Sequence, residues 1–309
     1  MGLLKRVFPW KKPVTRGVML DFSAKGTVVI SGAVFLSAVL LRSAKIEAGC
    51  EVDPGVYING TFVESDSQDA EVPECRERVY GIFPSSLLFV MGAVVSVFSA
   101  ISMPVVGSFL DQSPYRRQAG AASAWVMVAA NALQLMIYDT TLWFPVALLQ
   151  LVSGVAYLVH NDVSYAYLPE TTTDLKELES IMLASNMWFF CTEIVFLILV
   201  VIVVLAAGLE TRGSAVVSQG LVTCWAGLFF GTAWHFLFED RGARSAGGST
   251  CSGFEQLYFT ARRFYHEEPS VVRWLVGYAF ADAAGTGITT VAATYLIDEL
   301  GFEASELAI

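Results

Sequence analysis

Charged residues are scarce in this sequence: Asp, Glu, Lys and Arg make up 16% of its 309 residues, whereas hydrophobic residues make up 55%. A soluble domain of this size has no core large enough to hide so much apolar surface from water. Strand-like alternation of apolar and polar residues is also absent, which disfavours a transmembrane barrel. The composition therefore predicts an all-α polytopic membrane protein.

The sequence also lacks the spacings that carry most enzyme chemistry. Its three histidines are scattered, and no His-Glu-x-x-His spacing, nucleophile–base arrangement or phosphate-binding loop is present. The net charge of −10 is not accompanied by a basic and aromatic surface, so we set nucleic-acid binding aside. We expect no catalytic activity, no metal site and no cofactor.

What the sequence does contain is a series of long apolar stretches, each close to or above the roughly 20 residues that cross a bilayer. There are seven: Val18 to Leu41, Val79 to Val106, Ala119 to Tyr138, Leu142 to Leu168, Ile181 to Ala207, Ser214 to Phe238 and Val271 to Leu296. An odd number of spans places the two ends of such a protein on opposite sides of the membrane.

The basic residues indicate the orientation. If the N-terminus is cytoplasmic, fourteen of the 19 lysines and arginines lie inside and five outside. This is the positive-inside bias of membrane proteins, and it argues against a seven-span receptor, whose N-terminus would lie outside.

The acidic loop 42–78 between the first two stretches fits a lumenal, oxidising face. It contains Cys50, Cys75 and the glycosylation acceptor Asn59-Gly60-Thr61. We expect a disulfide bond between Cys50 and Cys75 and a glycan on Asn59. The alternative is two free thiols and an unused acceptor.

Two charged residues enter the first stretch. Asp21 and Lys25 are spaced i, i+4, so they can form an ion pair at the cytoplasmic edge of the helix. Two readings stay open: interfacial side chains that snorkel to water, or a gating pair.

Ionisable groups within the bilayer are costly and must face a polar cavity or a partner. Glu193 lies near the middle of the fifth stretch and Asp282 well inside the seventh. Helical spacing adds polar companions on three helices, which predicts a shared substrate or proton cavity: Tyr157, Asn161, Asn186, Tyr278 and Thr286. Hydrogen bonding between helices without transport is the alternative, and His160 is either a proton carrier or a structural residue.

The link between the second and third stretches reads Gly107-Ser-Phe-Leu-Asp111-Gln-Ser-Pro-Tyr-Arg116-Arg117. An aspartate at a helix end and two arginines one loop later can form a charge relay that locks neighbouring helices. This gating loop resembles that of the major facilitator superfamily, although Gln112 and Pro114 replace the usual basic residue and glycine.

Two further segments resemble one branch of that superfamily, the autophagy-linked vacuolar amino-acid effluxer family. The fourth stretch ends in Ala166-Tyr-Leu-Pro169-Glu170, and the seventh runs Val272-Arg-Trp-Leu-Val-Gly-Tyr-Ala-Phe-Ala-Asp282. The resemblance implies export of neutral amino acids from a vacuole or lysosome to the cytosol. Because no Lys or Arg lies deep in a span, a strongly anionic substrate is not expected.

We therefore predict a secondary active transporter in the lipid bilayer that works by alternating access on a small neutral amino acid, with protons as candidate coupling ions. The alternatives are a non-transporting scaffold or receptor-like protein, a channel, and a transporter of another solute. The expected parts are a cytoplasmic basic N-terminus (1–17), a six-helix bundle (18–238), a cytoplasmic linker with an amphipathic helix (239–270) and the first helix of an incomplete second bundle (271–309). On this reading the chain is a truncated twelve-helix transporter.

Overall fold

The computed structural model describes residues 13–50, 57–58, 61–62, 78–112, 115–238, 252–298 and 300. Its first element is a long rod in which α2 (Pro13–Ile30) continues through the π-helical turn η1 (Ser31–Leu36) into α3 (Ser37–Glu47). The rod contains the first predicted span. Single π-helical turns within α-helices are uncommon and are frequent at functional sites.

The remaining long helices follow the predicted order. They are α4 (Leu87–Gln112), α5 (Arg116–Leu133), α6 (Trp143–Thr171), α7 (Leu175–Ala207), α8 (Thr211–Thr232), α9 (Ser252–Glu267) and α10 (Pro269–Asp298). Short turns accompany them: the 3-10 turns η2 (Pro84–Ser86), η3 (Gln134–Tyr138) and η4 (Thr140–Leu142), and the π-helical turn η5 (Ala233–Leu237). The prediction of an all-α polytopic membrane protein is confirmed.

The second span begins later than its apolar residues suggest. The stretch was expected from Val79, but helix begins only at Pro84, after a tight turn in which Tyr80 and Gly81 have positive φ angles of 52° and 82°. Such backbone cannot continue a right-handed helix, and Pro84 at the first helical position marks the new start.

Within the described residues, six helices are long and apolar enough to cross a membrane: Pro13–Glu47, Pro84–Ser108, Arg116–Tyr138, Trp143–Pro169, Leu175–Ala207 and Thr211–Leu237. The seventh predicted stretch is a continuous helix, α10, but it is not among these six. It contains two charged residues, Arg273 and Asp282, between its ends. Its role as a span remains a prediction.

The rod α2–η1–α3 is the centre of the bundle. In its most apolar stretch 72% of residues are buried, against 11–50% in the other five helices. It packs against α7 and α8, while α5 packs on α6 and α8. Close contact with α7 depends on Gly26, because a Cβ there would lie 2.6 Å from the carbonyl oxygen of Phe189.

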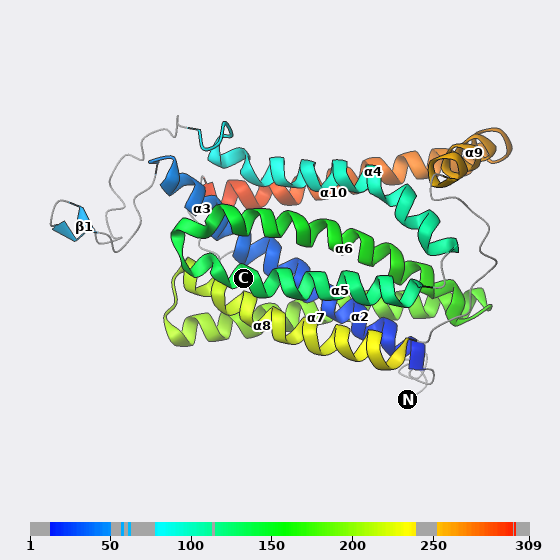
Figure 1. Ribbon diagram of the computed structural model, residues 1–309, viewed down its shortest axis with the longest axis horizontal. Helices are drawn as coiled ribbons and strands as arrows, with labels where there is room; N and C mark the ends of the chain where they lie inside the picture. Colours follow the sequence, from blue (N-terminus) through cyan, green and yellow to red (C-terminus); the bar gives the residue numbers. More distant parts are fainter. Residues whose placement is uncertain are drawn as a thin grey trace.

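The helices α9 and α10 lie against one flank of this bundle. Figure 1 shows α10 running alongside α4, with α9 at one end of the pair. The amphipathic helix expected in the linker is present as α9, and its aromatic residues, including Phe254, Tyr258 and Phe259, are exposed. Its placement on a membrane surface stays a prediction, as do the predicted domain boundaries.

Of the range 42–78, the structure describes residues 42–50, where α3 ends, residue 78 and two antiparallel strands, β1 (Tyr57–Ile58) and β2 (Thr61–Phe62). Cys50 takes part in a disulfide bond. Cys75 and Asn59 lie outside the described residues, so the Cys50–Cys75 pairing and the glycan remain predictions.

Candidate functional site

A completely buried carboxylate lies inside the bundle. Asp21 of α2 is 0% exposed, and one of its oxygens, Oδ1, is 2.7 Å from Nε2 of His160 and accepts a 2.7 Å hydrogen bond from Nε1 of Trp234. The other oxygen, Oδ2, accepts a 2.7 Å bond from Ser164 and lies 3.2 Å from Nζ of Lys25. These five residues, here called the charged cluster, join α2, α6 and η5.

Lys25 is equally buried, at 1% exposure. Besides Asp21, its ammonium group donates to Oδ1 of Asn161 (3.2 Å) and lies 3.7 Å from the centre of the Phe22 ring, a favourable cation–π position. The ion pair expected from the i, i+4 spacing is therefore present. The interfacial reading of the pair is contradicted, because the central position of α2 keeps both side chains away from solvent.

The same observation corrects the inference that no lysine lies deep in a span. Lys25 is inside the bundle, yet its ammonium group is already shared between Asp21 and Asn161. A substrate carboxylate would have to displace one of these partners before it could bind there.

His160 has partners that suit both of its protonation states. Its Nδ1 is 2.9 Å from the hydroxyl of Ser123 and 3.2 Å from the carbonyl oxygen of Gly120. A neutral ring with its proton on Nε2 can accept from Ser123, whereas a protonated ring can donate from Nδ1 to Gly120 and from Nε2 to Asp21. The ring can thus gain or lose a proton without losing a hydrogen bond.

The position of Trp234 depends on a glycine. A Cβ at Gly120 would overlap the Trp234 ring, and the same ring stacks on Phe238 with centroids 4.3 Å apart. The ring also packs edge-on against His160 and Tyr167. Gly120 therefore admits the indole that donates to Asp21.

The predicted gating loop is connected to this cluster. Arg117 donates from Nε to the carbonyl oxygen of Trp234 (3.0 Å) and from Nη2 to that of His235 (2.8 Å). Arg116 donates to the carbonyl oxygen of Leu110 (2.9 Å) near the end of α4. Both arginines thus bind terminal carbonyl groups, where a cation is favoured by the helix dipole.

The other two residues of that loop are less informative. Gly107 has open space around its α-carbon, since a Cβ there would have no neighbour within 4 Å. The backbone of Asp111 belongs to α4, but its side chain lies outside the described residues. The charge relay between Asp111 and the arginines therefore stays a prediction.

The predicted cavity residues divide into two sets. Tyr157, Asn161 and Glu193 are half-buried, and Tyr157 interacts electrostatically with both Glu193 and Asp21. Asn161 connects this half-buried surface to Lys25. These three residues thus share a region next to the charged cluster.

The remaining predicted cavity residues are more exposed. Asn186 and Asp282 are exposed, and Tyr278 of α10 is 60% exposed, although it interacts electrostatically with Tyr165 of α6. The side chain of Thr286 lies outside the described residues. A polar surface shared by α6, α7 and α10 is compatible with these positions but remains a prediction.

A second polar group lies further along the bundle and is neutral. Gln134 donates to Oε1 of Gln150 (2.8 Å), and Ser31 of the η1 turn shares a 2.7 Å hydrogen bond with Ser218. Gln219 is 0% exposed, and neither atom of its amide has a hydrogen-bond partner among the described residues. We call these five residues the amide cluster.

Sequence reasoning missed Trp234 as a member of the charged cluster, and it missed Ser123 as a partner of His160. A buried Asp–Lys pair in the first span was the available signal, because an internal charge requires further donors. No group of three or more His, Cys, Asp or Glu that could hold a metal ion occurs in the described part of the chain.

Comparison with known proteins gives one match. A family model described as "Vacuole effluxer Atg22 like" matches residues 11–309, which is nearly the whole chain. No curated protein and no solved structure matches.

Proposed function

The chain belongs to the vacuole effluxer Atg22-like family and is thus a membrane transporter; from this premise we propose that it exports neutral amino acids from the vacuole to the cytosol, driven by protons. The observation that carries the coupling is the fully buried contact between Asp21 and His160. An imidazole can carry or release a proton, and here it lies beside a carboxylate and a hydroxyl that can bond to either form.

The proposed coupling works through charge balance in the charged cluster. With His160 neutral, the charges of Asp21 and Lys25 cancel, and a proton on His160 leaves the cluster with one positive charge. A net charge buried in a low-dielectric interior is unfavourable. Protonation thus favours a rearrangement that opens the cluster to water.

Trp234 is the residue that transmits this rearrangement. Its indole donates to Asp21, while its carbonyl group accepts from Arg117 of the gating loop. Loss of the indole bond loosens the end of η5, where Arg117 joins α5 to η5. In an alternating-access cycle this end of the bundle is the gate.

The proposed substrate contacts are the half-buried neighbours of the cluster. Glu193 supplies a carboxylate for an ammonium group, and Tyr157 and Asn161 supply a hydroxyl and an amide for a carboxylate. In this proposal Asp282, Asn186 and Tyr278 extend the polar surface from α7 and α10. A zwitterion fits such a mixture better than an anion does, because the buried Lys25 is already paired.

Transport in vesicles tests the proposal. The full chain is reconstituted into liposomes, and efflux of labelled leucine is followed with and without a pH gradient. We expect saturable transport accelerated by the gradient. His160→Gln should abolish the acceleration but retain exchange of labelled for unlabelled leucine, since exchange requires no net proton movement.

Glu193→Gln serves as the contrasting variant, because it should impair exchange and gradient-driven efflux alike. Leu183→Ala, a change at an exposed position of the same helix that adds no polar group, is the control and should leave both unchanged. Absence of saturable transport for every neutral amino acid would contradict the proposed substrate class. Equal gradient dependence in His160→Gln and the unmodified chain would contradict the coupling.

A further inference from the structure

Lys25 is the most loosely held member of the charged cluster. Three partners of Asp21 lie 2.7 Å from its oxygens: His160, Ser164 and Trp234. The ammonium group of Lys25 is farther away, at 3.2 Å. Charge-assisted bonds between an ammonium group and a carboxylate are usually about 2.7 to 2.9 Å long. Lys25 can therefore leave Asp21 while the three shorter contacts stay in place.

The other described contacts of Lys25 are with neutral groups. Its ammonium group donates to Oδ1 of Asn161 (3.2 Å) and lies 3.7 and 5.6 Å from the centres of the Phe22 and Tyr165 rings. An amide and two aromatic rings stabilise a cation but do not cancel its charge. In the described state Lys25 thus takes its counter-charge from Asp21.

A proton on His160 changes this balance. It places a second cation 2.7 Å from the carboxylate of Asp21, so that one carboxylate faces two cations. The surplus positive charge is unfavourable in a buried site. A further anion beside Lys25 restores neutrality, because Asp21 then pairs with His160 and Lys25 with the new anion. The carboxylate of an amino acid is such an anion.

Asn161 gives an anion a route to Lys25. Lys25 is 1% exposed, whereas its partner Asn161 is half-buried and lies one helical turn from the half-buried Tyr157. Tyr157 interacts electrostatically with both Glu193 and Asp21. One carbon atom joins the ammonium and carboxylate groups of an amino acid. A substrate whose ammonium group is held by Glu193 therefore places its carboxylate near this surface.

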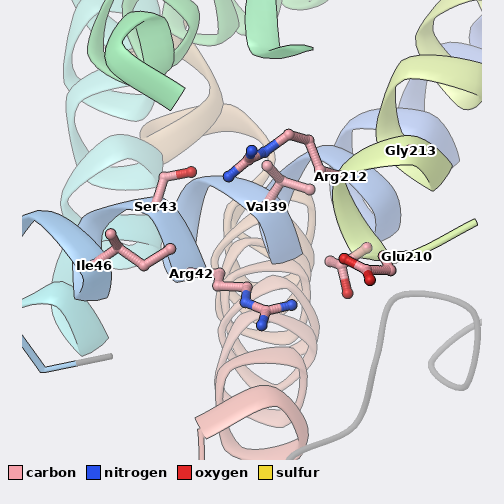
Figure 2. A pocket seen from close by; sticks show the side chains of 8 residues that line it. Val39, Arg42, Ser43, Ile46, Glu210, Arg212 and Gly213 are labelled. Atoms are coloured by element: carbon pink, nitrogen blue, oxygen red, sulfur yellow. The ribbon is translucent and has the colours of Figure 1, made fainter. Parts of the chain in front are cut away.

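A second place where basic side chains come together is less suited to this role. Figure 2 shows Arg42 of α3 and Arg212 of α8 at a cavity of about 150 Å³. Both arginines already have partners, and Arg212 also interacts electrostatically with Asp139. Their charges are thus engaged, whereas a proton on His160 makes the charge of Lys25 available.

We propose that Lys25 binds the carboxylate of the substrate when His160 carries a proton, so that substrate and proton bind cooperatively. This inference rests on the amino-acid substrate and the proton coupling proposed above. Three ion pairs form in the loaded state: Asp21 with His160, Lys25 with the substrate carboxylate, and Glu193 with the substrate ammonium group. An amine that has no carboxylate lacks the second pair, so its binding gains nothing from the proton.

Binding of leucine and of leucinol, which has a hydroxymethyl group in place of the carboxylate, tests the proposal. The full chain in lipid nanodiscs is titrated with each compound at neutral and at acidic pH. Leucine should bind about tenfold or more tightly at acidic pH, and leucinol should gain no affinity. In weakly buffered solution, leucine binding should also take up protons, because the coupling is reciprocal.

Leucinol also controls for other groups that titrate. The helices beside Lys25 carry Tyr157, Asp162 and Tyr165 on α6, Glu193 on α7 and His235 on η5. Leucinol keeps the ammonium group and the side chain of leucine, so titration of these residues affects both compounds alike. The difference between the two compounds therefore reports on the carboxylate.

Variants test the role of the lysine. Lys25→Met should remove most of the preference for leucine over leucinol, and Lys25→Arg, which keeps the charge, should retain part of it. The double variant Asp21→Asn with Lys25→Met leaves no unpaired charge and guards against misfolding, and it should also bind both compounds equally. Lys176→Met, at an exposed position at the start of α7, is the charge-matched control and should keep the preference unchanged.

Equal pH dependence for leucine and leucinol would overturn this inference and leave amino-acid export untouched. The same holds for leucine binding without proton uptake, and for a Lys25→Met variant that keeps the full preference for leucine. Binding of no neutral amino acid would instead contradict the proposed substrate class, and this inference with it.

Discussion

The charged cluster and the amide cluster occupy two levels of the same bundle. They differ in how many of their polar side-chain atoms have hydrogen-bond partners. Both oxygens of Asp21 and the ammonium group of Lys25 have partners. In the amide cluster, the amide oxygen of Gln134 and both polar atoms of the Gln219 amide have no hydrogen-bond partner among the described residues.

The difference follows from the cost of burial. An unpaired ion in a low-dielectric interior is far less favourable than an unpaired amide, so a bundle that retains an internal charge must surround it with donors and acceptors. Neutral amides can remain incompletely bonded, at a cost of about 1 to 3 kcal/mol each. The charged cluster should therefore be sensitive to every substitution, and the amide cluster only to some.

The largest expected effect is that of removing the buried carboxylate charge. Asp21→Asn leaves Lys25 without its counter-ion and should lower the free energy of unfolding by about 3 to 5 kcal/mol. Denaturant titration in mixed micelles measures this loss. The double variant Asp21→Asn with Lys25→Met removes both charges and should recover much of it; a double variant as unstable as the single one would show that the ion pair is not the cause.

Gly120→Ala should have the next largest effect, because the new methyl group overlaps the ring of Trp234 and displaces the donor to Asp21. Overpacking of this kind lowers stability by about 1 to 3 kcal/mol. The matched control is Gly231→Ala, whose Cβ would lie 3.7 Å from the nearest atom, an ordinary contact with Trp125. The same titration measures both, and equal losses in the two variants would contradict this account.

Substitutions in the amide cluster should be milder and should differ in sign. Gln219→Leu removes an amide that has no partner in the described chain and should be neutral or stabilising by about 1 kcal/mol. Gln134→Leu leaves Gln150 without its donor and should be destabilising by a similar amount. Thermal unfolding of both variants measures the contrast, and a large loss in Gln219→Leu would mean that its amide is hydrogen-bonded in the membrane.

The smallest effect concerns Asp139, which lies outside the spans in the turn before α6. The backbone N–H and the hydroxyl of Thr141 donate to its carboxylate (3.0 and 2.8 Å) and hold the pKa of Asp139 below its ordinary value. A lowered pKa contributes stability that is present above the ordinary aspartate pKa and is lost as pH falls through the lowered value. Asp139→Asn keeps an acceptor but does not titrate.

The measurement is the unfolding temperature of both proteins across the acidic range. The unmodified chain should lose slightly more stability on acidification than Asp139→Asn does. Parallel curves would contradict a stabilising role for the Asp139 charge.

Predictions from the sequence were correct where they depended on residues that are close together along the chain. Seven apolar stretches predicted helices that are all present, and the spacing of Asp21 and Lys25 predicted their ion pair. The predicted start of the second span was wrong, because the positive φ angles of Tyr80 and Gly81 prevent a helix there although the neighbouring residues are apolar. The residues of the charged cluster were only partly foreseen, with His160 considered and Trp234 missed.

Hydropathy and helical periodicity depend on neighbouring residues, so the sequence by itself determined the fold class and the order of the helices. Only the tertiary structure decided that Asp21 meets His160 and Trp234, which lie 139 and 213 residues away along the chain. It also decided that Lys25 is buried, because α2 lies at the centre of the bundle. Contacts of this kind depend on which faces of the helices pack together, and this packing is close at glycines such as Gly26 and Gly120. No pattern of neighbouring residues in the sequence determines which faces meet.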